Sequence, residues 1–404
     1  MRAALDRVVS NASKRLPHVL LVCPVADQIG GAEKVMLAIA RELPSHGFSP
    51  VIAVMRPGVL VELARTQGTE TYAFPEDHRY RDIGSIRRAA SWLTDVARRT
   101  GASLQHATHT AHLYAYFASQ SARIPELWHV HDLPSDGDPV SWLNRRLIPN
   151  HTLFTTKLVA EAYPRLLKHP YTVVLPTCVE PNVLRHRERR YDVRSRFGLP
   201  EGPMLLTVAR LQAHKGHSYL VHAAAQVLRR RPDAVFAVVG TAKTRDQERY
   251  REELLVQAQR FGVSERVRLI GSVDDADLAE LYRQSTALVH PAWSEGYGLV
   301  LLEAMSMGLP VIAAAAAGPA EILRNGNNGI LVPVRDAAAL ADAVIQVISE
   351  DSLRSQLKAA GTVTVEQLTL HEMVTRTAVV YRQMISADSR ATVRQPEEPS
   401  SRHL

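Results

Sequence analysis

The 404-residue sequence has only two cysteines, Cys23 and Cys178, and no long apolar run. Two cysteines are too few for a disulfide scaffold. The cysteines and histidines also lack the spacing of zinc ligands, which excludes a zinc finger. Each cysteine lies in an apolar stretch typical of a strand, which predicts buried free thiols in a reducing compartment. No run of about 18 apolar residues is present, so we expect no membrane-spanning helix. Residues 1–16 lack a signal-peptide core, which predicts a cytoplasmic protein.

Acidic residues are outnumbered by basic ones, 41 Asp and Glu against 48 Lys and Arg, which gives a formal charge of +7. A basic protein is expected to meet nucleic acid, an anionic membrane or phosphorylated ligands. The sequence has neither a basic stripe with interleaved aromatic residues nor a known nucleic-acid-reading helix, so we expect no nucleic-acid partner. A phosphorylated ligand is the preferred partner, and peripheral contact with the inner face of an anionic membrane is a second candidate.

Apolar runs of strand length alternate with amphipathic segments of helix length, which is typical of parallel α/β architecture. The predicted strands are 18–24, 50–55, 71–74, 104–106, 126–130, 153–155, 172–175, 204–208, 234–239, 267–270, 287–290, 311–313 and 330–332. We predict two Rossmann-like parallel-sheet lobes, the first over 17–184 and the second over 197–370. A basic segment at 185–196 predicts a linker, and polar residues 387–404 predict a disordered tail.

Two features of the first half concern single helices. Residues 32–46 predict a helix, which Gly47 ends in a left-handed conformation. Apolar residues recur at helical spacing over 83–97 and are flanked by arginines, which is compatible with a helix lying on a membrane surface. We favour the alternative, a helix of the Rossmann layer that packs its apolar stripe on the sheet.

The densest group of motif residues follows the predicted strand that ends at His290. A loop carries Glu295, and Gly296 and Gly298 permit close approach of the backbone before a helix begins near Leu299. Free N–H groups and the positive end of a helix dipole then face the loop. The sequence therefore predicts a phosphate site at this helix start.

Glu295 and Glu303 are separated by seven residues. Because a carboxylate repels a phosphate, we expect both to accept hydrogen bonds from sugar or ribose hydroxyls. The spacing and the surrounding EGYGLVLLEAMSMGLPVIA resemble the signature of retaining glycosyltransferases of the GT-B fold, family 4 (glycosyltransferase group 1 type). The resemblance implies a GT-B architecture in which the two lobes face a cleft: the first lobe binds the acceptor and is joined by a crossover helix at 371–385, and the second lobe binds the donor nucleotide. It also implies transfer of a sugar from a nucleoside-diphosphate sugar, with UDP favoured, to a hydroxyl acceptor, with retention and without a cofactor or metal. A sugar-nucleotide epimerase or hydrolase and a non-catalytic sugar-nucleotide-binding module stay open as alternatives.

The resemblance also implies which residues bind the donor. Arg210 and Lys215 match the R-x4-K-G loop of the family, where two cations stabilise the departing diphosphate. Glu295 is expected to face the sugar hydroxyls and Glu303 the ribose. Residues 317–321 resemble the GG-x-x-E loop, with alanine where the first glycine is common. The implied donor-binding residues are Gly30, Gly31, Arg210, Lys215, Gly271, Glu295, Gly296, Tyr297, Gly298, Leu299 and Glu303.

In the first lobe, His131 ends a strand and matches the family histidine that contacts the transferred sugar. The expected catalytic residues are His131, Arg210, Lys215 and Glu295. The expected acceptor contacts are Glu33, His106 and Asp132.

Two metal-site alternatives are weak, and we predict no metal ligands. His106, His109 and His112 are three residues apart, and this spacing does not put all three side chains on one strand face. Asp136 and Asp138 form a carboxylate pair in a Gly/Pro loop with no supporting context.

Overall fold

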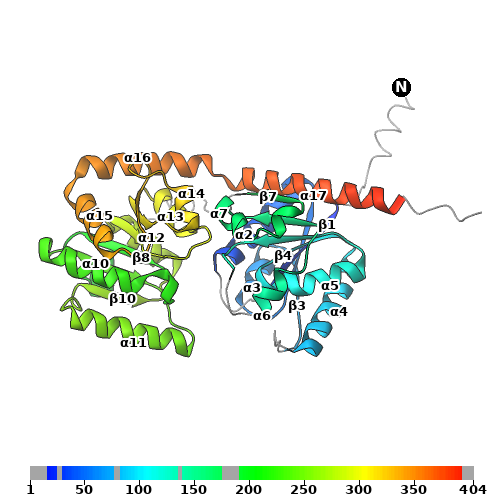
Figure 1. Cartoon of the computed structure of the whole chain (residues 1–404), viewed down its shortest axis with the longest axis horizontal. Coiled ribbons are helices and arrows are strands. Elements are labelled where there is room, and N and C mark those ends of the chain that lie inside the picture. The colour runs from blue at the N-terminus through cyan, green and yellow to red at the C-terminus, as the bar shows by residue number, and fades with distance from the viewer. Residues whose placement is uncertain (1–15, 25–29, 77–81, 135–138, 175–190, 394–404) are drawn as a thin grey trace, which may run out of the picture.

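The two halves of the chain form two separate parallel sheets in the computed structural model (Figure 1). The structure describes residues 16–24, 30–76, 82–134, 139–174 and 191–393. The first sheet has seven strands in the order β3-β2-β1-β4-β5-β6-β7, and the second has six in the order β10-β9-β8-β11-β12-β13. Helices cover the faces of both sheets (Figure 1). This confirms the prediction of two Rossmann-like lobes.

Each predicted strand has a counterpart in the sheets. Their bounds are β1 (His18–Cys23), β2 (Ser49–Val54), β3 (Glu70–Ala73), β4 (Ala102–Thr108), β5 (Glu126–Val130), β6 (His151–Phe154), β7 (Tyr171–Val173), β8 (Met204–Val208), β9 (Val235–Val239), β10 (Val267–Gly271), β11 (Ala287–His290), β12 (Val311–Ala314) and β13 (Ile330–Val332). The central strands are buried on both faces, as the continuous run Val19–Cys23 shows, because helices lie above and below a parallel sheet. Continuous apolar runs are therefore what made these strands visible in the sequence.

The helices alternate with the strands along the chain. Those of the first lobe are α2 (Gly31–Glu42), α3 (Val59–Thr66), α4 (Ile83–Thr100), α5 (His112–Ala122), α6 (Pro139–Asn144) and α7 (Lys157–Glu161). Those that follow are α9 (Val193–Phe197), α10 (His217–Arg230), α11 (Arg245–Arg260), α12 (Asp275–Gln284), α13 (Leu299–Ser306), α14 (Ala317–Ile322), α15 (Ala337–Ser349), α16 (Asp351–Gln367) and α17 (Leu370–Val393). Short 3-10 turns are η1 (Leu43–His46), η2 (His109–Ala111), η3 (Leu166–Lys168) and η4 (Ala213–Lys215).

The predicted helix over 32–46 is α2 followed by η1. The change to a 3-10 turn falls at Pro44, whose missing N–H cannot make the next α-helical hydrogen bond. Gly47 ends the turn with φ of 81°, the left-handed conformation predicted for it. The chain can then turn directly into β2.

Helix α4 is a layer helix, as we favoured. Asp82 caps its first turn by accepting hydrogen bonds from the N–H groups of Gly84 and Ser85. Leu93 and Val96 are fully or almost fully buried in the same apolar cluster as residues of β1 and β2. The apolar stripe thus faces the core.

Helix α17 is the crossover helix, and it lies along the first lobe while α16 covers the second (Figure 1). Val374, Ala378 and Tyr381 of α17 are buried in the core cluster of α2 and β1. The helix continues to Val393, although disorder was predicted from residue 387. Residues 394–404 lie outside the described part of the chain.

Several predictions fall on residues that the structure does not describe. They concern Cys178, Asp136, Asp138 and residues 185–190 of the basic linker. Cys23 is described: it is a buried free thiol, and burial together with nearby Glu33 raises its pKa. Among the described residues, no helix combines the length and the apolar character that a bilayer span needs.

Candidate functional site

The centre of the site is a buried ion pair between Lys215 of η4 and Glu295 of the loop after β11. The Lys215 Nζ to Glu295 Oε2 distance is 2.9 Å, and the two side chains are only 15% and 13% exposed. His290, at the end of β11, places its Nε2 3.0 Å from the same oxygen. Burial raises the pKa of Glu295, but Lys215 and His290 together outweigh it, so the net pKa lies below the ordinary value. The carboxylate is therefore charged at neutral pH.

A glycine holds the Lys215 loop against the end of β11. Gly216 has φ of 76°, and a Cβ built on it would lie 2.0 Å from the carbonyl oxygen of Pro291. The loop is joined to the next segment by two bonds from Trp293, whose N–H donates to His214 O and whose ring Nε1 donates to Ala213 O. In the K-G part of the motif, Lys215 thus provides the charge and Gly216 permits the close backbone contact.

Arg210, the other predicted diphosphate ligand, follows β8 and has an exposed side chain. Its guanidinium makes no ion pair with any described residue. Burial lowers the pKa of His214, and the charges of Lys215 and Arg210 lower it further. The three basic side chains therefore lie near one another. Arg210 is the most exposed of these three basic side chains.

Helix α13 begins at Leu299, as predicted, and Gly298 is its N-cap residue with φ of 98°. A Cβ on Gly298 would lie 2.3 Å from Leu301 Cδ1. A Cβ on Gly296 would lie 1.9 Å from the carbonyl oxygen of His131, which belongs to the first lobe. Gly296 therefore lets the glutamate loop of the second lobe touch the end of β5.

The first turn of α14 supports the Glu295 loop through a backbone hydrogen bond. Gly318 N–H donates to Glu295 O at 2.9 Å, and a Cβ on Gly318 would lie 2.1 Å from Tyr297 O. Ala317, the departure from the family pattern, packs on an apolar cluster of the first lobe. Glu321 accepts a hydrogen bond from the N–H of Leu158 in α7. Helix α14 thus joins the two lobes next to the site.

The donor contact predicted for Tyr297 stays a prediction, and it concerns the backbone of this residue. Its side chain is 5% exposed and packs in the core of the second lobe, because the left-handed Gly298 turns the chain inward there. Only its backbone remains near the site. Gly271, by contrast, has φ of 90° and nothing within 4 Å of a built Cβ, so the space beside it is open.

Glu303 lies in α13 and faces α2 of the first lobe. Its Oε1 accepts from Lys34 Nζ at 3.0 Å, and its Oε2 accepts from Tyr282 OH at 2.9 Å. Leu299 of the same helix approaches Gly31, where a Cβ would lie 3.2 Å from Leu299 Cδ1. The starts of α2 and α13 therefore meet, and the two predicted glycine loops form one region.

His131 follows β5 and is 8% exposed, with no hydrogen-bond partner for its Nε2 among the described residues. Its ring stacks on His129 with centroids 3.9 Å apart and lies 5.1 Å from the ring of His109. Burial lowers the pKa of His131 well below the ordinary value, and His129 and His109 add to the effect. His131 is therefore a neutral imidazole with one unused nitrogen at the contact between the lobes.

The acceptor contact predicted for His106 is not supported, because its side chain is completely buried. His106 Nδ1 is hydrogen-bonded to Tyr381 OH of α17, and its Nε2 lies 3.2 Å from His129 Nδ1. His106 therefore links the crossover helix to the histidines behind the site. Packing of α17 over β4 buries His106, which the sequence had led us to expect at an accessible position.

The burial of His106 predicts a pH dependence of stability. Burial and the neighbouring His131 lower its pKa from 6.5 to about 3. The unfolded chain binds the proton more readily, so stability falls as the pH drops from 6.5 towards 3. We expect His106→Gln to make the slope of the unfolding free energy shallower by about 1.4 kcal/mol per pH unit in this range. Urea unfolding at several pH values measures the slope, and equal slopes in the two proteins would contradict a neutral His106.

The other two predicted acceptor contacts have different surroundings. Glu33 caps α2, since its Oε2 accepts from Gly30 N at 2.9 Å. Asp132 is 66% exposed, and its Oδ2 lies 3.4 Å from His109 Nδ1. Asp132 is thus available to a ligand, whereas Glu33 already shapes the loop.

Sequence reasoning missed three side chains that hold the glutamates: His290, Lys34 and Tyr282. His290 was visible as a strand end, and Lys34 lies one turn along α2 from the Gly30 loop. Tyr282 left no signal in the sequence, because it belongs to the ordinary apolar pattern of α12.

The fold and the site define a class of protein, the GT-B glycosyltransferase architecture of two parallel-sheet lobes that meet at a glutamate loop. The crystal structure of Anabaena Alr3699/HepE in complex with UDP and glucose has a TM-score of 0.77 and 21% identity, and the match covers 90% of this chain and 99% of that one. Residues 192–364 match the model of the family described as Glycosyl transferases group 1.

Two curated relatives are named D-inositol 3-phosphate glycosyltransferase. The one from Acidothermus cellulolyticus is 31% identical over 324 residues, which are 78% of this chain and 67% of that protein. The one from Frankia alni is 40% identical over 175 residues, which are 42% of each chain. The segment aligned to the Frankia protein therefore spans less than half of that relative. Because the Acidothermus relative is matched over two thirds of its length, the chain belongs to the glycosyl transferases group 1 family.

Proposed function

We propose that this protein transfers a sugar from a nucleoside-diphosphate sugar to a hydroxyl acceptor, with retention of configuration and without a bound metal. The observation that carries the proposal is the buried Lys215–Glu295 pair beside the start of α13, on a loop whose Gly296 contacts the backbone of His131 of the other lobe. Charged, sugar-binding and reacting groups are thereby brought together from both lobes.

The leaving diphosphate is stabilised by the second lobe. Arg210 offers a planar fork of donors, Lys215 a compact charge, and the first turn of α13 its free N–H groups. These groups counter the negative charge that develops as the glycosidic bond breaks. They replace the divalent cation that would otherwise neutralise a diphosphate.

The two glutamates position the donor. Both described contacts of Glu295 are made by Oε2, which leaves Oε1 for a sugar hydroxyl. Glu303 binds the ribose hydroxyls after exchange of Lys34, whose side chain is 44% exposed and easily displaced. Tyr282 keeps its bond to Oε2 and holds the carboxylate in place.

His131 Nε2 is buried and has no hydrogen-bond partner among the described residues, and we infer that donor binding brings it into contact with the transferred sugar. A neutral imidazole can donate a hydrogen bond to a sugar oxygen without adding a charge. UDP is the favoured nucleotide, and the structure of Anabaena Alr3699/HepE with UDP and glucose supports this choice. The relatives named for D-inositol 3-phosphate make a phosphorylated polyol a reasonable first acceptor to test.

The proposal is tested first by thermal shift with UDP-, GDP- and ADP-sugars, followed by an assay of nucleotide release with the sugar that binds. We expect His131→Ala to keep the thermal shift but to lower kcat by about 10²-fold, because the histidine acts on the reacting sugar. An unchanged rate in the variant would contradict this role.

Further outcomes separate the alternatives. Addition of EDTA should leave the rate unchanged, and NMR of the product should show the anomeric configuration of the donor. Donor binding without turnover would indicate a non-catalytic module. A changed sugar on the recovered nucleotide would indicate an epimerase, and no shift with any sugar nucleotide would refute the donor assignment.

A further inference from the structure

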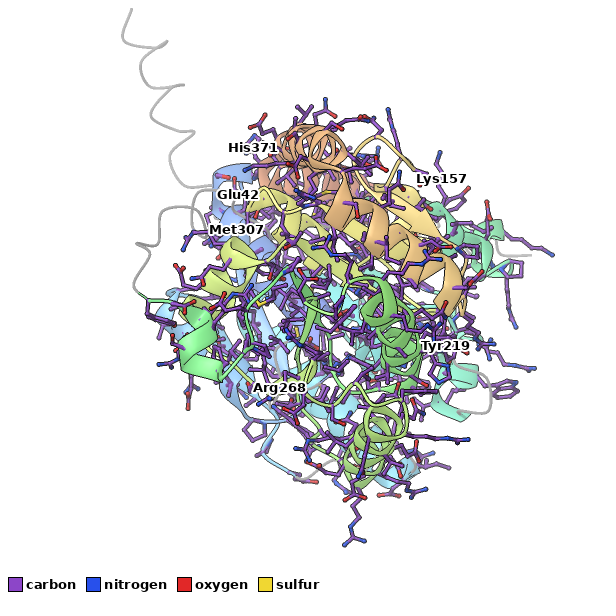
Figure 2. The ribbon with its side chains drawn as sticks, turned by 90° about the vertical axis from the view of Figure 1, so that its left-hand side faces the viewer. Glu42, Lys157, Tyr219, Arg268, Met307 and His371 are labelled. Atoms are coloured by element: carbon purple, nitrogen blue, oxygen red, sulfur yellow. The ribbon has the colours of Figure 1, made fainter. Side chains whose placement is uncertain are left out.

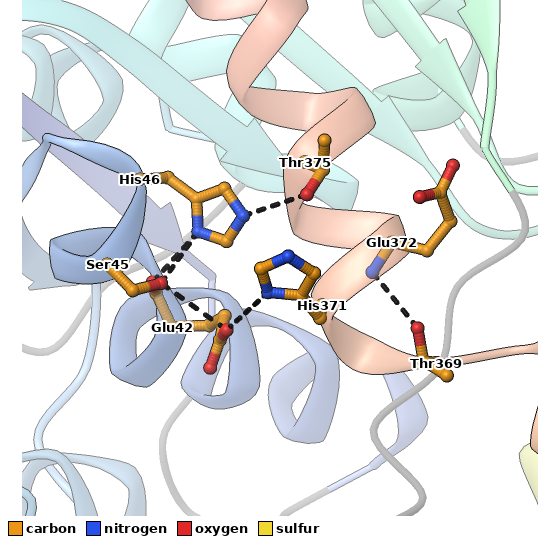
Figure 3. A network of polar contacts seen from close by, with 7 residues as sticks. All are labelled: Glu42, Ser45, His46, Thr369, His371, Glu372 and Thr375. Carbon is orange, nitrogen blue, oxygen red and sulfur yellow. Dashed lines mark hydrogen bonds and ion pairs between the residues drawn. The ribbon is translucent and has the colours of Figure 1, made fainter.

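A second group of ionisable side chains lies at the junction of α17 with the first lobe. Glu42 is the last residue of α2, His46 the last of η1, and His371 the second of α17. Each offers one ligand atom, and the three atoms lie within 4.8 Å of one another. Figure 2 labels Glu42 and His371 close together, and Figure 3 shows the Glu42 carboxylate beside the rings of His46 and His371.

The donor set is that of a zinc-type ion. Two imidazoles and one carboxylate form a common set for Zn²⁺, with water as the fourth ligand. Glu42 Oε1 and His371 Nδ1 are 3.1 Å apart. Ligands bound tetrahedrally at zinc distances are separated by roughly 3.3 Å, so this pair needs almost no adjustment.

The surroundings hold the His46 ring in one orientation. Its Nδ1 lies 2.9 Å from Ser45 Oγ and 3.2 Å from the carbonyl oxygen of Glu42. Because Ser45 donates its own proton to that carbonyl at 2.7 Å, Nδ1 is the donor to both oxygens and carries the proton. Its Nε2 lies 2.9 Å from Thr375 Oγ1 and accepts the proton of that hydroxyl, so an ion would take the Nε2 lone pair in place of Thr375. Donation from one ring nitrogen to a backbone carbonyl is the usual support of a metal-binding histidine.

The group is accessible to solvent. The His371 side chain is 71% exposed and that of Glu42 26%. An ion can therefore enter, and water can complete its coordination. None of the three residues belongs to the Lys215–Glu295 site.

We propose that Glu42, His46 and His371 bind one divalent cation of the zinc class. The ion ties the first turn of α17 to the end of α2. Because α17 follows α16, which covers the second lobe, this bond fixes the point at which the chain returns to the first lobe. The site is structural and takes no part in sugar transfer.

The test is titration of the untagged, EDTA-treated full chain with Zn²⁺ by calorimetry. We expect one ion per chain, and His371→Ala should weaken its binding at least about tenfold. This variant should fold normally, since His371 is mostly exposed. Glu42→Gln, which keeps the shape of the side chain, should weaken binding as well.

The matched control is His169→Ala, which removes an exposed histidine elsewhere on the first lobe. It should leave zinc binding unchanged, and Zn²⁺ should raise the Tm of this variant and of the wild type but not that of His371→Ala. A tenfold excess of Mg²⁺ should not compete, because that ion prefers an octahedron of oxygens. Undiminished binding in His371→Ala, or no stoichiometric binding in the wild type, would overturn the proposal.

Discussion

Replacing Lys215 with alanine is expected to lower kcat/KM for the sugar nucleotide by about 10²–10³-fold, because a cation facing the leaving diphosphate is lost. The change should also destabilise the fold. Glu295 would remain buried without its ion-pair partner, and breaking such a pair costs about 3–5 kcal/mol. Steady-state kinetics and urea unfolding measure the two effects separately.

The effect of Lys215→Ala on stability depends on pH. Burial opposes the charge on Glu295, but Lys215 and His290 hold its folded pKa below 4.5. The stabilisation is therefore complete above pH 4.5 and is lost as the pH falls through the lower folded value. The difference in unfolding free energy between wild type and Lys215→Ala should be larger at pH 7 than at pH 4.

A double variant separates stability from catalysis. Lys215→Ala combined with Glu295→Gln should recover part of the lost stability, because no charge is left unpaired, but it should not recover activity. Lys243→Ala is the matched control, since Lys243 is an exposed lysine in the loop after β9. Wild-type kcat/KM in Lys215→Ala would show that this lysine does not face the diphosphate.

Replacing Gly296 with alanine is expected to reduce kcat/KM by about 10²-fold or more. Its Cβ would lie 1.9 Å from His131 O and 3.2 Å from Asp132 Cα, so the glutamate loop must move away from the first lobe. A displacement of about 1 Å at a reacting centre is enough for a loss of this size. Both lobes keep their cores, so the variant should fold.

Gly84→Ala is the control for Gly296→Ala. Gly84 lies in the first turn of α4, where the nearest atom to a built Cβ is the flexible end of Arg88 at 3.4 Å. Alanine suits a helix better than glycine, so this variant should be active and up to about 1 kcal/mol more stable. If Gly296→Ala has wild-type kinetics and melting, contact between the loop and His131 is not required for turnover.

Much of the fold could be predicted from the sequence, because the signals are local. A strand buried on both faces is a continuous apolar run, and β5, β8, β11 and β13 have the predicted bounds. Gly47 and the start of α13 at Leu299 were also predicted, since a left-handed glycine or a glycine loop marks a helix end within a few residues. The pairing of Lys215 with Glu295 was not, although each residue was recognised by its motif.

Tertiary structure alone decided what the side chains of the site contact. Glu303 meets Lys34, which is 269 positions away in the sequence, and His106 meets Tyr381, which is 275 positions away. These contacts arise because the C-terminal ends of the parallel strands in the two sheets face one another, and because α17 returns to cover β4. No local pattern specifies such a pairing, so His106 looked accessible in the sequence and is buried in the protein. The residue types at the site were thus determined by the sequence, and their partners and protonation by the packing of the lobes.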